Sequence, residues 1–311
     1  MNATALGLAV GAALDRCCGD PRRRHPVAGF GTLASKLEER MWRDNRTAGA
    51  AYLALTVGTT TGAAWWAYRL ARRRRWSELV FSAAVTWAAL GQRSLIEAAD
   101  AVSRPLLANE MAEARGALGA LCAREADDLD ADELAAATVE SVAENTSDAS
   151  IAPLWWGVVA GPVGIVAHRC VNTLDAMVGY RTRRYRRFGT AAARLDDVMN
   201  FVPARLTALA AIAFAPAVGG TSVEAARVVS RDSAAHPSPN AGTAEAAFAG
   251  ALGVRIGGTV NTYGDTRDRR PRLGRGRRVR RHDIARANRL SWLIYTTAVA
   301  TAVVARWRCR R

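Results

Sequence analysis

Residues 139–178 read VESVAENTSDASIAPLWWGVVAGPVGIVAHRCVNTLDAMV, and this stretch decides the fold class. Its central run, residues 149–167, is 19 residues long, carries no charge, and has carboxylates and carboxamides on both flanks. An apolar run of that length predicts a membrane-spanning helix. Polar groups so close to a bilayer are costly unless they serve a site. The stretch therefore predicts a membrane-embedded protein with a site for a charged ligand.

Other uncharged runs extend this pattern along the chain. Residues 47–68 end in Trp65, Trp66 and Tyr68, aromatic residues typical of a membrane interface. The shorter uncharged runs are residues 206–223, 290–305, 1–14 and 79–92. Each is expected to be a membrane span, a buried helix or an interfacial helix. We expect an all-α polytopic protein with four to six membrane-associated helices. It forms one domain over residues 1–311 and ends in a C-terminal membrane helix.

Glycine and proline interrupt the central run at Pro153, Gly157, Gly161, Pro162 and Gly164. Broken helices at membrane depth usually line a site or turn back. A straight crossing would place the two polar flanks on opposite sides of the membrane. We therefore favour a re-entrant hairpin, which keeps the flanks together.

Polar stretches separate the apolar runs. Residues 98–143 predict two amphipathic helices with a break at residues 127–130. Residues 236–242, HPSPNAG, predict a rigid turn, and residues 266–281 predict an exposed, Arg-rich loop. We find no internal repeat and no series of strands in the sequence.

The formal net charge of +15 raises the question of nucleic-acid binding. The basic residues are nearly all arginines beside apolar runs, as at residues 72–75 and 306–311. Attraction to anionic lipid and retention on the cytoplasmic side explain such charges. We expect a multi-pass cell-membrane protein that contacts the lipid bilayer, binds no nucleic acid and has a cytoplasmic site. With residues 72–75 inside, however, a crossing at residues 47–68 puts residues 15–46 outside, and the sequence leaves this conflict open.

Three carboxylates, Glu140, Glu144 and Asp148, are spaced four apart and share one face if the helix continues that far. Stacked carboxylates repel one another unless cations lie between them, and Mg²⁺ binds carboxylate oxygens together with nucleotide phosphates. The alternative is a solvated helix face that ends in capping residues, because residues 145–148 are all good N-cap residues.

A second polar group has carboxamides and carboxylates three or four residues apart, so that each pair faces one way on a helix. The pairs are Asn172 with Asp175, Asp197 with Asn200, and Asp196 with Asn200. Arg194 and Arg205 flank the two adjacent aspartates and suit a metal or phosphate site with its counter-charges. An ordinary surface ion-pair network explains the same segment equally well.

Two loops carry further polar groups: Asp20 with His25, and His236 with Asn240. Each suits ligand binding, although an Asp-Pro turn with one histidine is more often structural. The sequence holds no GxxxxGK[ST], and Lys36 is its single lysine, so a nucleotide would be held by carboxylate-bound Mg²⁺ and arginines. HExxH and GxSxG motifs are also missing from the sequence.

Taken together, these motifs resemble the adenosylcobinamide-phosphate synthase family of cobalamin biosynthesis over about residues 10–265. The motifs are Asp15, Gly19-Asp20-Pro21, His25-Pro26-Val27, Gly31, VESVAENTSD at 139–148, Ala152-Pro153, NTLDAMVGY at 172–180, Arg184-Tyr185, Phe188-Gly189, ARLDD at 193–197, Asn200, Pro203-Ala-Arg205, HPSPNAG at 236–242 and GALG at 250–253. The chain departs from the family at Arg169, where Lys is usual, and at Ala123-Arg124-Glu125, where Gly-Arg-Asp is usual.

The resemblance implies an ATP-dependent acid–amine ligase in the membrane. Such an enzyme joins a carboxylate of adenosylcobyric acid to aminopropanol or its phosphate. Its partners are then the corrinoid acid, the amino alcohol and other membrane enzymes of the pathway, with Mg²⁺ as cofactor and ATP as co-substrate. A magnesium-dependent phosphotransferase or prenyltransferase is less favoured, because such sites need paired Asp motifs of fixed spacing on two helices. A non-catalytic corrinoid-binding membrane protein is the third hypothesis.

On this hypothesis the site residues fall into three groups. The catalytic candidates are Glu144, Asp148, Asp175, Asp196 and Asp197. The metal candidates are Glu140, Glu144, Asp148, Asp196 and Asp197. The substrate-binding candidates are Asp20, His25, Arg124, Asn145, Asn172, Arg194, Asn200, Arg205, His236 and Asn240.

Overall fold

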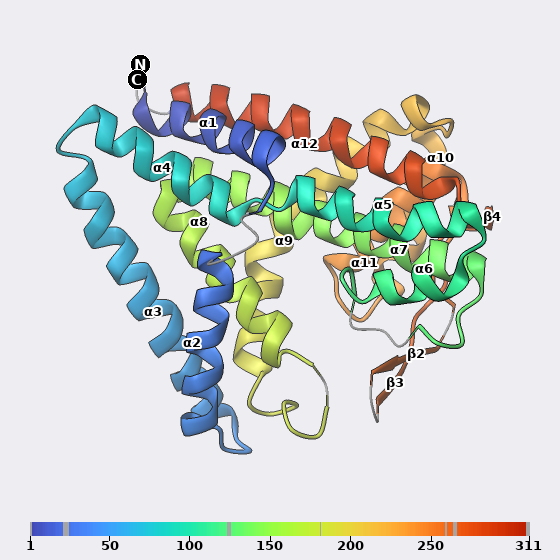
Figure 1. Cartoon of the computed structure of the whole chain (residues 1–311), viewed down its shortest axis with the longest axis horizontal. Helices are drawn as coiled ribbons and strands as arrows, with labels where there is room; N and C mark the ends of the chain where they lie inside the picture. The colour runs from blue at the N-terminus through green and yellow to red at the C-terminus, as the bar shows by residue number, and fades with distance from the viewer. Residues whose placement is uncertain are drawn as a thin grey trace. The chain divides into compact units, whose positions relative to one another are not determined.

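A computed structural model describes residues 2–20, 25–122, 126–180, 182–258, 260–263 and 266–308. These residues are almost entirely helical, as the sequence predicts (Figure 1). The α-helices are α1 (Ala3–Cys18), α2 (Pro26–Met41), α3 (Arg46–Ala71), α4 (Arg75–Ala89), α5 (Gln92–Ala108), α6 (Met111–Leu118), α7 (Ala131–Thr146), α8 (Ala152–Val178), α9 (Thr190–Phe214), α10 (Ser222–Asp232), α11 (Ala241–Leu252) and α12 (Asp283–Arg308). Three shorter helices are the π-helix η1 (Ser147–Ile151) and the 3₁₀-helices η2 (Ala215–Val218) and η3 (Ser233–Ala235).

Short strands are a departure from the predicted pattern. The strand β1 (Val254–Arg255) pairs in parallel with β4 (Arg277–Arg278), and β2 (Val260–Tyr263) pairs antiparallel with β3 (Thr266–Arg269). The prediction of a loop over residues 266–281 is therefore wrong in part. Strands of two to four residues are too short to show the alternation of apolar and polar residues that identifies a strand in a sequence.

The described chain divides into two compact units. Unit 1 comprises Met1–Gly91, Ala152–Asn200 and Thr297–Arg311, and unit 2 comprises Gln92–Ile151 and Phe201–Thr296. Neither unit is a continuous stretch of sequence, so each is assembled from segments that are far apart along the chain.

Three helical stretches among the described residues are long and apolar enough to cross a membrane. They are Arg75–Ala108, Ala131–Val178 and Thr190–Val218. This finding confirms the all-α membrane class. The helices α3 and α12 are 26 residues long but less apolar. Threonine, glycine and aromatic residues lower the mean hydropathy of α3, and arginines lower that of α12. Their association with the membrane stays a prediction.

In unit 1, α1 packs along α4 (Figure 1). The approach is close, since a Cβ added at Gly11 would lie 2.7 Å from the carbonyl oxygen of Ala83. The buried carboxylate of Glu78 accepts hydrogen bonds from the hydroxyls of Thr4, at 2.9 Å, and Tyr68, at 3.1 Å. Small residues let helices approach in a membrane, and buried hydrogen bonds then hold the pair.

The helix α8 bends sharply at Gly161, where φ is 66° and ψ is −160°. Residues with a Cβ rarely adopt such a conformation. A Cβ added at Gly157 would lie 3.1 Å from Cδ1 of Ile165, whereas residues eight apart on a straight helix are separated by about 12 Å. The chain therefore changes direction at Gly161, where the sequence predicts an interruption. Re-entry with respect to a bilayer stays a prediction.

The predicted break at residues 127–130 is confirmed by a capping box at the start of α7. The Asp130 carboxylate accepts from the backbone N–H of Glu133 at 2.8 Å, and the Glu133 carboxylate accepts from that of Asp130 at 3.0 Å. This arrangement satisfies two donors that otherwise have no partner in the helix. The prediction of two helices over residues 98–143 is wrong, because Asn109, with a φ of 63°, separates α5 from α6 and makes three.

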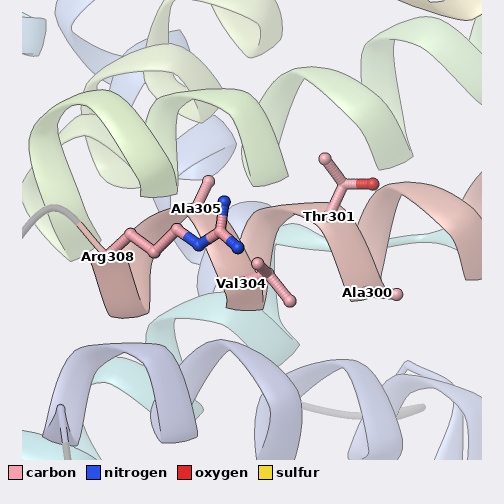
Figure 2. Close-up of a pocket in the computed structure, with 5 residues that line it drawn as sticks. All are labelled: Ala300, Thr301, Val304, Ala305 and Arg308. Atoms are coloured by element: carbon pink, nitrogen blue, oxygen red, sulfur yellow. The ribbon is translucent and has the colours of Figure 1, made fainter.

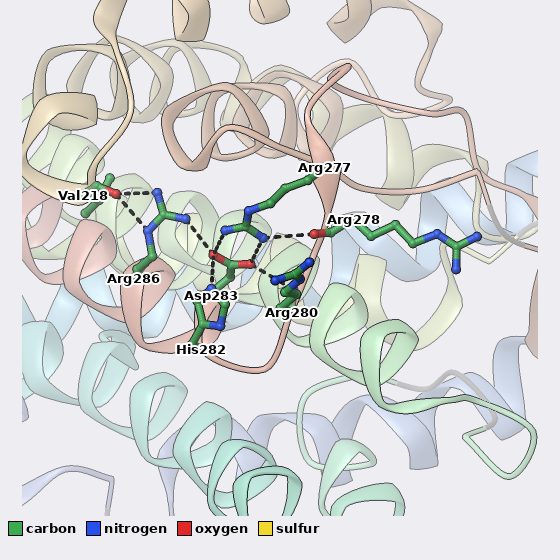
Figure 3. Close-up of polar contacts among 7 residues, drawn as sticks. All are labelled: Val218, Arg277, Arg278, Arg280, His282, Asp283 and Arg286. Atoms are coloured by element: carbon green, nitrogen blue, oxygen red, sulfur yellow. Dashed lines mark hydrogen bonds and ion pairs between the residues drawn. The ribbon is translucent and has the colours of Figure 1, made fainter.

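In unit 2, a fully buried aspartate ties β4, α12 and η2 together (Figure 3). Asp283 accepts hydrogen bonds from both terminal nitrogens of Arg277, from Arg286 at 2.6 Å, and from the backbone N–H of Arg280. Arg286 in turn donates to the carbonyl oxygen of Val218 at 2.9 Å. Burial acts to raise the pKa of Asp283, but these hydrogen bonds outweigh burial and lower the pKa to about 2.

Candidate functional site

In unit 1, helices α8 and α9 bring together a ladder of polar side chains. His168 Nε2 lies 2.8 Å from Asn200 Oδ1, and Asn172 Nδ2 donates to Asp196 Oδ1 at 3.3 Å. Arg169 Nη1 donates to Asn172 Oδ1 at 3.3 Å. The paired positions rise along one helix as they fall along the other, so the two helices run antiparallel here. We call these five residues the α8–α9 cluster.

Only some of the residues predicted in this region form hydrogen bonds within the cluster. Asn172, Asp196 and Asn200 are members of it, and the last two are buried. Asp197 is half-buried on α9, and Arg194 is exposed. The half-buried Asp175 carboxylate lies against Gly179, where an added Cβ would clash with it.

The sequence-based prediction did not include His168. A lone histidine in an apolar helix is usually a core residue, and only its four-residue spacing from Asn172 indicated a shared face. Its Nδ1 and the Nδ2 of Asn200 are buried without a hydrogen-bond partner among the described residues. If Nε2–H donates to Asn200 Oδ1, then Nδ1 is left as an acceptor and the Asn200 amide keeps an unused donor. An acceptor and a donor are the two kinds of group with which a carboxamide forms hydrogen bonds.

In unit 2, the first carboxylate of the acidic stretch has a structural partner. Glu140 is buried, and its Oε1 accepts a hydrogen bond from the backbone N–H of Gly257 at 2.8 Å. Gly257 has a φ of 67°, which suits glycine. One oxygen of Glu140 therefore holds a glycine turn, so Glu140 is less suited to a metal than the sequence indicates.

The face predicted for Glu144 and Asp148 depends on a helix that changes type. The helix α7 ends at Thr146 and continues as the π-helix η1, so the condition of a regular α-helix through Asp148 is not met. Within residues 137–151, the side chains that are not buried are Glu144, Asn145 and Asp148. All three are polar and belong to the predicted motif. We call them the acidic face.

Arg205 and Asn240, both predicted to bind substrate, are in contact in unit 2. Arg205 Nη1 donates to Asn240 Oδ1 at 2.6 Å, and its guanidinium lies 3.8 Å from the centre of the Phe201 ring. The ring and the carboxamide hold the planar guanidinium in one orientation, which suits recognition of a phosphate or carboxylate.

His236 is buried in the predicted turn, and both of its ring nitrogens have partners. Nδ1 lies 2.9 Å from the carbonyl oxygen of Ser238, and Nε2 is hydrogen-bonded to Arg270 Nη1. Since arginine only donates, Nε2 is the acceptor in its contact with Arg270, and Nδ1 also accepts from the backbone N–H of Ser238 at 3.1 Å. Glu245 Oε1 lies 3.8 Å from Nε2. Arg270 was missed because it is one of many arginines in its segment.

The remaining predicted residues lie near the N-terminus or outside the described chain. His25 caps α2 by accepting from the backbone N–H of Val27 at 3.2 Å, and its Nε2 is 3.7 Å from Asp20 Oδ1. This geometry serves the turn itself and leaves ligand binding a prediction. Arg124 lies outside the described residues.

The acidic residues suit a metal–nucleotide complex better than a metal held by protein alone. Within the described part of the chain, no three His, Cys, Asp or Glu side chains are grouped so that they could hold a metal ion. Mg²⁺ is usually bound by one or two carboxylates together with phosphate oxygens and water. Glu144 and Asp148, which both reach the surface, fit that requirement.

A cavity of about 590 Å³ lies beside α12 and does not coincide with any predicted residue (Figure 2). Its lining is mostly aliphatic, with one guanidinium: Ala300, Thr301, Val304, Ala305 and Arg308. This lining offers no carboxylate for Mg²⁺, so it does not suit Mg–ATP.

Comparison with known proteins gives one consistent result. The family model described as CobD/Cbib protein matches residues 8–291. A cobalamin biosynthesis protein CobD of Mycobacterium tuberculosis is 45% identical over 306 residues, which cover 98% of this chain and 97% of the relative. Proteins with the same description from Pelobacter propionicus and Rhodobacter capsulatus are 40% and 39% identical, covering 97% and 83% of this chain and 93% and 83% of their own lengths. No solved structure matches.

Proposed function

Because the chain belongs to the CobD/Cbib family, we propose that it acts in cobalamin biosynthesis as an ATP-dependent acid–amine ligase. The substrates are adenosylcobyric acid and aminopropanol or aminopropanol phosphate, and the product is their amide. The observation that carries the proposal is the acidic face, where the polar residues of an otherwise buried stretch reach the surface. Carboxylates in a membrane-embedded helix are costly, and such residues usually mark a functional site.

The chemistry requires ATP because a carboxylate is a poor electrophile. A carboxylate oxygen of the corrinoid acid bonds to the γ-phosphorus of ATP, and the bond from that phosphorus to ADP breaks. The amine nitrogen then attacks the acyl carbon of the resulting acyl phosphate, and phosphate leaves with the electron pair of the C–O bond. A protein carboxylate takes the proton lost by the nitrogen.

We assign these roles to separate groups of residues. Glu144 and Asp148 hold Mg²⁺, which when bound neutralises phosphate charge. Arg205, oriented by its contact with Asn240, binds a phosphate oxygen. Asp196 and Asp197 are candidates for a further metal contact or for the base.

The α8–α9 cluster suits the amide side chains of the corrinoid. His168 and Asn200 offer an acceptor and a donor to a carboxamide ligand, and Asn172 adds a further carboxamide. The bend at Gly161 and the apolar helices around the cluster support a site at a cell membrane. We propose that the site faces the cytoplasm, since ATP is available there.

The test incubates membranes containing the protein with ATP, Mg²⁺, the corrinoid acid and each amine separately, and identifies products by mass. We expect an amide, with ADP and phosphate released only when both the acid and an amine are present. A phosphorylated amine without amide would instead indicate a phosphotransferase. Corrinoid binding without ATP hydrolysis would indicate a carrier. Either result would overturn the proposal.

A further inference from the structure

We propose that a buried chain of hydrogen bonds between Gln92, Thr146, Ser150 and Ser291 fixes the π-helix η1 and so positions Asp148 relative to Glu144. The proposal rests on the proposed function, since it concerns how the acidic face is oriented. The four side chains are positioning residues. They are buried, and none belongs to the acidic face.

The hydrogen bonds have one consistent direction. Ser150 Oγ donates to Gln92 Oε1 at 2.7 Å, and Gln92 Nε2 donates to Ser291 Oγ at 2.9 Å. The hydroxyls of Ser291 and Thr146 are 2.6 Å apart, and Thr146 donates to the carbonyl oxygen of Val142 at 2.6 Å. Because the proton of Thr146 is used there, Ser291 donates to Thr146. The hydroxyls of Ser291 and Thr146 then each donate once and accept once, so successive bonds in the chain reinforce one another.

The chain of hydrogen bonds contacts the helix on both sides of Asp148. Thr146 is the last residue of α7, and Ser150 lies inside η1. Gln92, the first residue of α5, and Ser291 of α12 bridge the two hydroxyls. Neighbouring helices therefore hold the segment that contains Asp148 from both sides of that residue.

The π-helix matters because it sets the direction of the acidic face. A π turn contains one residue more than an α turn, and one residue corresponds to about 100° around a helix axis. Relaxation of η1 to a regular α-helix would therefore turn Asp148 away from its present direction relative to Glu144. Isolated π turns are rare and frequently occur at functional sites.

Two threonines on α7 provide a matched comparison. Thr138 and Thr146 are both fully buried, and each donates to the carbonyl oxygen four residues earlier. Thr146 alone of the two also contacts Ser291. Replacing either by valine removes one hydroxyl and keeps the shape, so a difference between the variants reports on the contact with Ser291.

The first measurement is the Mg²⁺ concentration that half-saturates amide formation by the full-length protein in membranes. We expect Thr146→Val and Ser291→Ala each to raise it about tenfold, the effect of losing one buried hydrogen bond. The double variant should be no worse than either single variant, because both break the same chain. Thr138→Val should change the half-saturating Mg²⁺ concentration less than twofold, roughly the scatter of such measurements. Thr146→Ser should return that concentration to the value of the unsubstituted protein. An unchanged value in Ser291→Ala, or an equal rise in Thr138→Val, overturns the proposal.

A second measurement does not depend on catalysis. In a background without native cysteines, Asp148→Cys is labelled with a polar maleimide, alone and combined with Thr146→Val, Ser150→Ala or Thr138→Val. We expect the labelling rate to change several-fold with the first two and not with the third. If labelling follows this pattern while the unsubstituted chain forms no amide, the proposed function fails and the positioning role stands. If the chain forms amide and labelling does not change, the positioning role fails. Should Thr146→Val not fold, Ser150→Ala decides between the same outcomes.

Discussion

Replacing Asp283 by asparagine removes the charge at the centre of the network in Figure 3 but keeps the shape of the side chain. The carboxylate is fully buried and accepts hydrogen bonds from Arg277 and Arg286. Asparagine can still accept some of these bonds, so the loss reports mainly on charge. We expect the variant to fold and to be less stable at neutral pH.

The magnitude follows from the pKa of Asp283, which is about 2 in the folded protein and 3.8 for an ordinary aspartate. A difference of nearly two pKa units corresponds to about 2 kcal/mol of folding stability. Because the folded-state pKa is the lower one, this stability is fully present above the unfolded-state pKa. It is lost as the pH falls toward the folded-state pKa. We therefore expect a deficit of about 2 kcal/mol at pH 7 and roughly half that near pH 3.

The assay is unfolding of the purified protein in detergent micelles at several pH values. The matched control is Glu224→Gln, since Glu224 pairs with Arg227 at 2.7 Å on a far more exposed surface. An exposed pair contributes at most about 1 kcal/mol. A loss in Asp283→Asn no larger than in the control, or a loss that does not shrink on acidification, would refute the reasoning.

The other predictions concern a bend, a helix start and the site. Gly161→Ala should destabilise the protein by about 1–3 kcal/mol, because alanine is strained at a φ of 66°, whereas Gly58→Ala, at an open helical position, should be neutral or stabilising by thermal unfolding. Asp130→Ala should cost about 1 kcal/mol through loss of the capping box, measured by the same method. Asp196→Ala should abolish amide formation while membrane fractionation shows normal insertion; normal turnover would contradict its assigned role.

The lengths of the uncharged runs and the positions of glycine and proline predicted much of the fold. Uncharged runs located the long helices, and the Gly161–Pro162 pair located the bend, because both signals are local. The short strands and the separate helix α6 were missed, since segments of two to eight residues show too little periodicity. The turn at Gly257 was also beyond prediction, because its partner, Glu140, lies more than 100 residues away.

The candidate site was predictable where spacing on one helix was enough. Asp196 and Asn200 lie on one face of α9 as their four-residue spacing indicates, whereas the contact of Asp196 with Asn172 joins two helices and could not be read from spacing. The π-helix η1 could not be read from residues 147–151, whose Ser and Asp residues indicate the end of a helix rather than a change of helix type. His168 and Gln92 carry no motif of their own, and their importance comes from partners on other helices.

The central claim is that carboxylates of the acidic face bind a divalent ion together with ATP. The most direct measurement replaces Mg²⁺ by Mn²⁺ and follows Mn²⁺ binding by electron paramagnetic resonance with and without ATP. The account predicts ATP-dependent Mn²⁺ binding that Glu144→Gln and Asp148→Asn abolish and Glu224→Gln leaves intact. Unchanged binding in both acidic-face variants would contradict it.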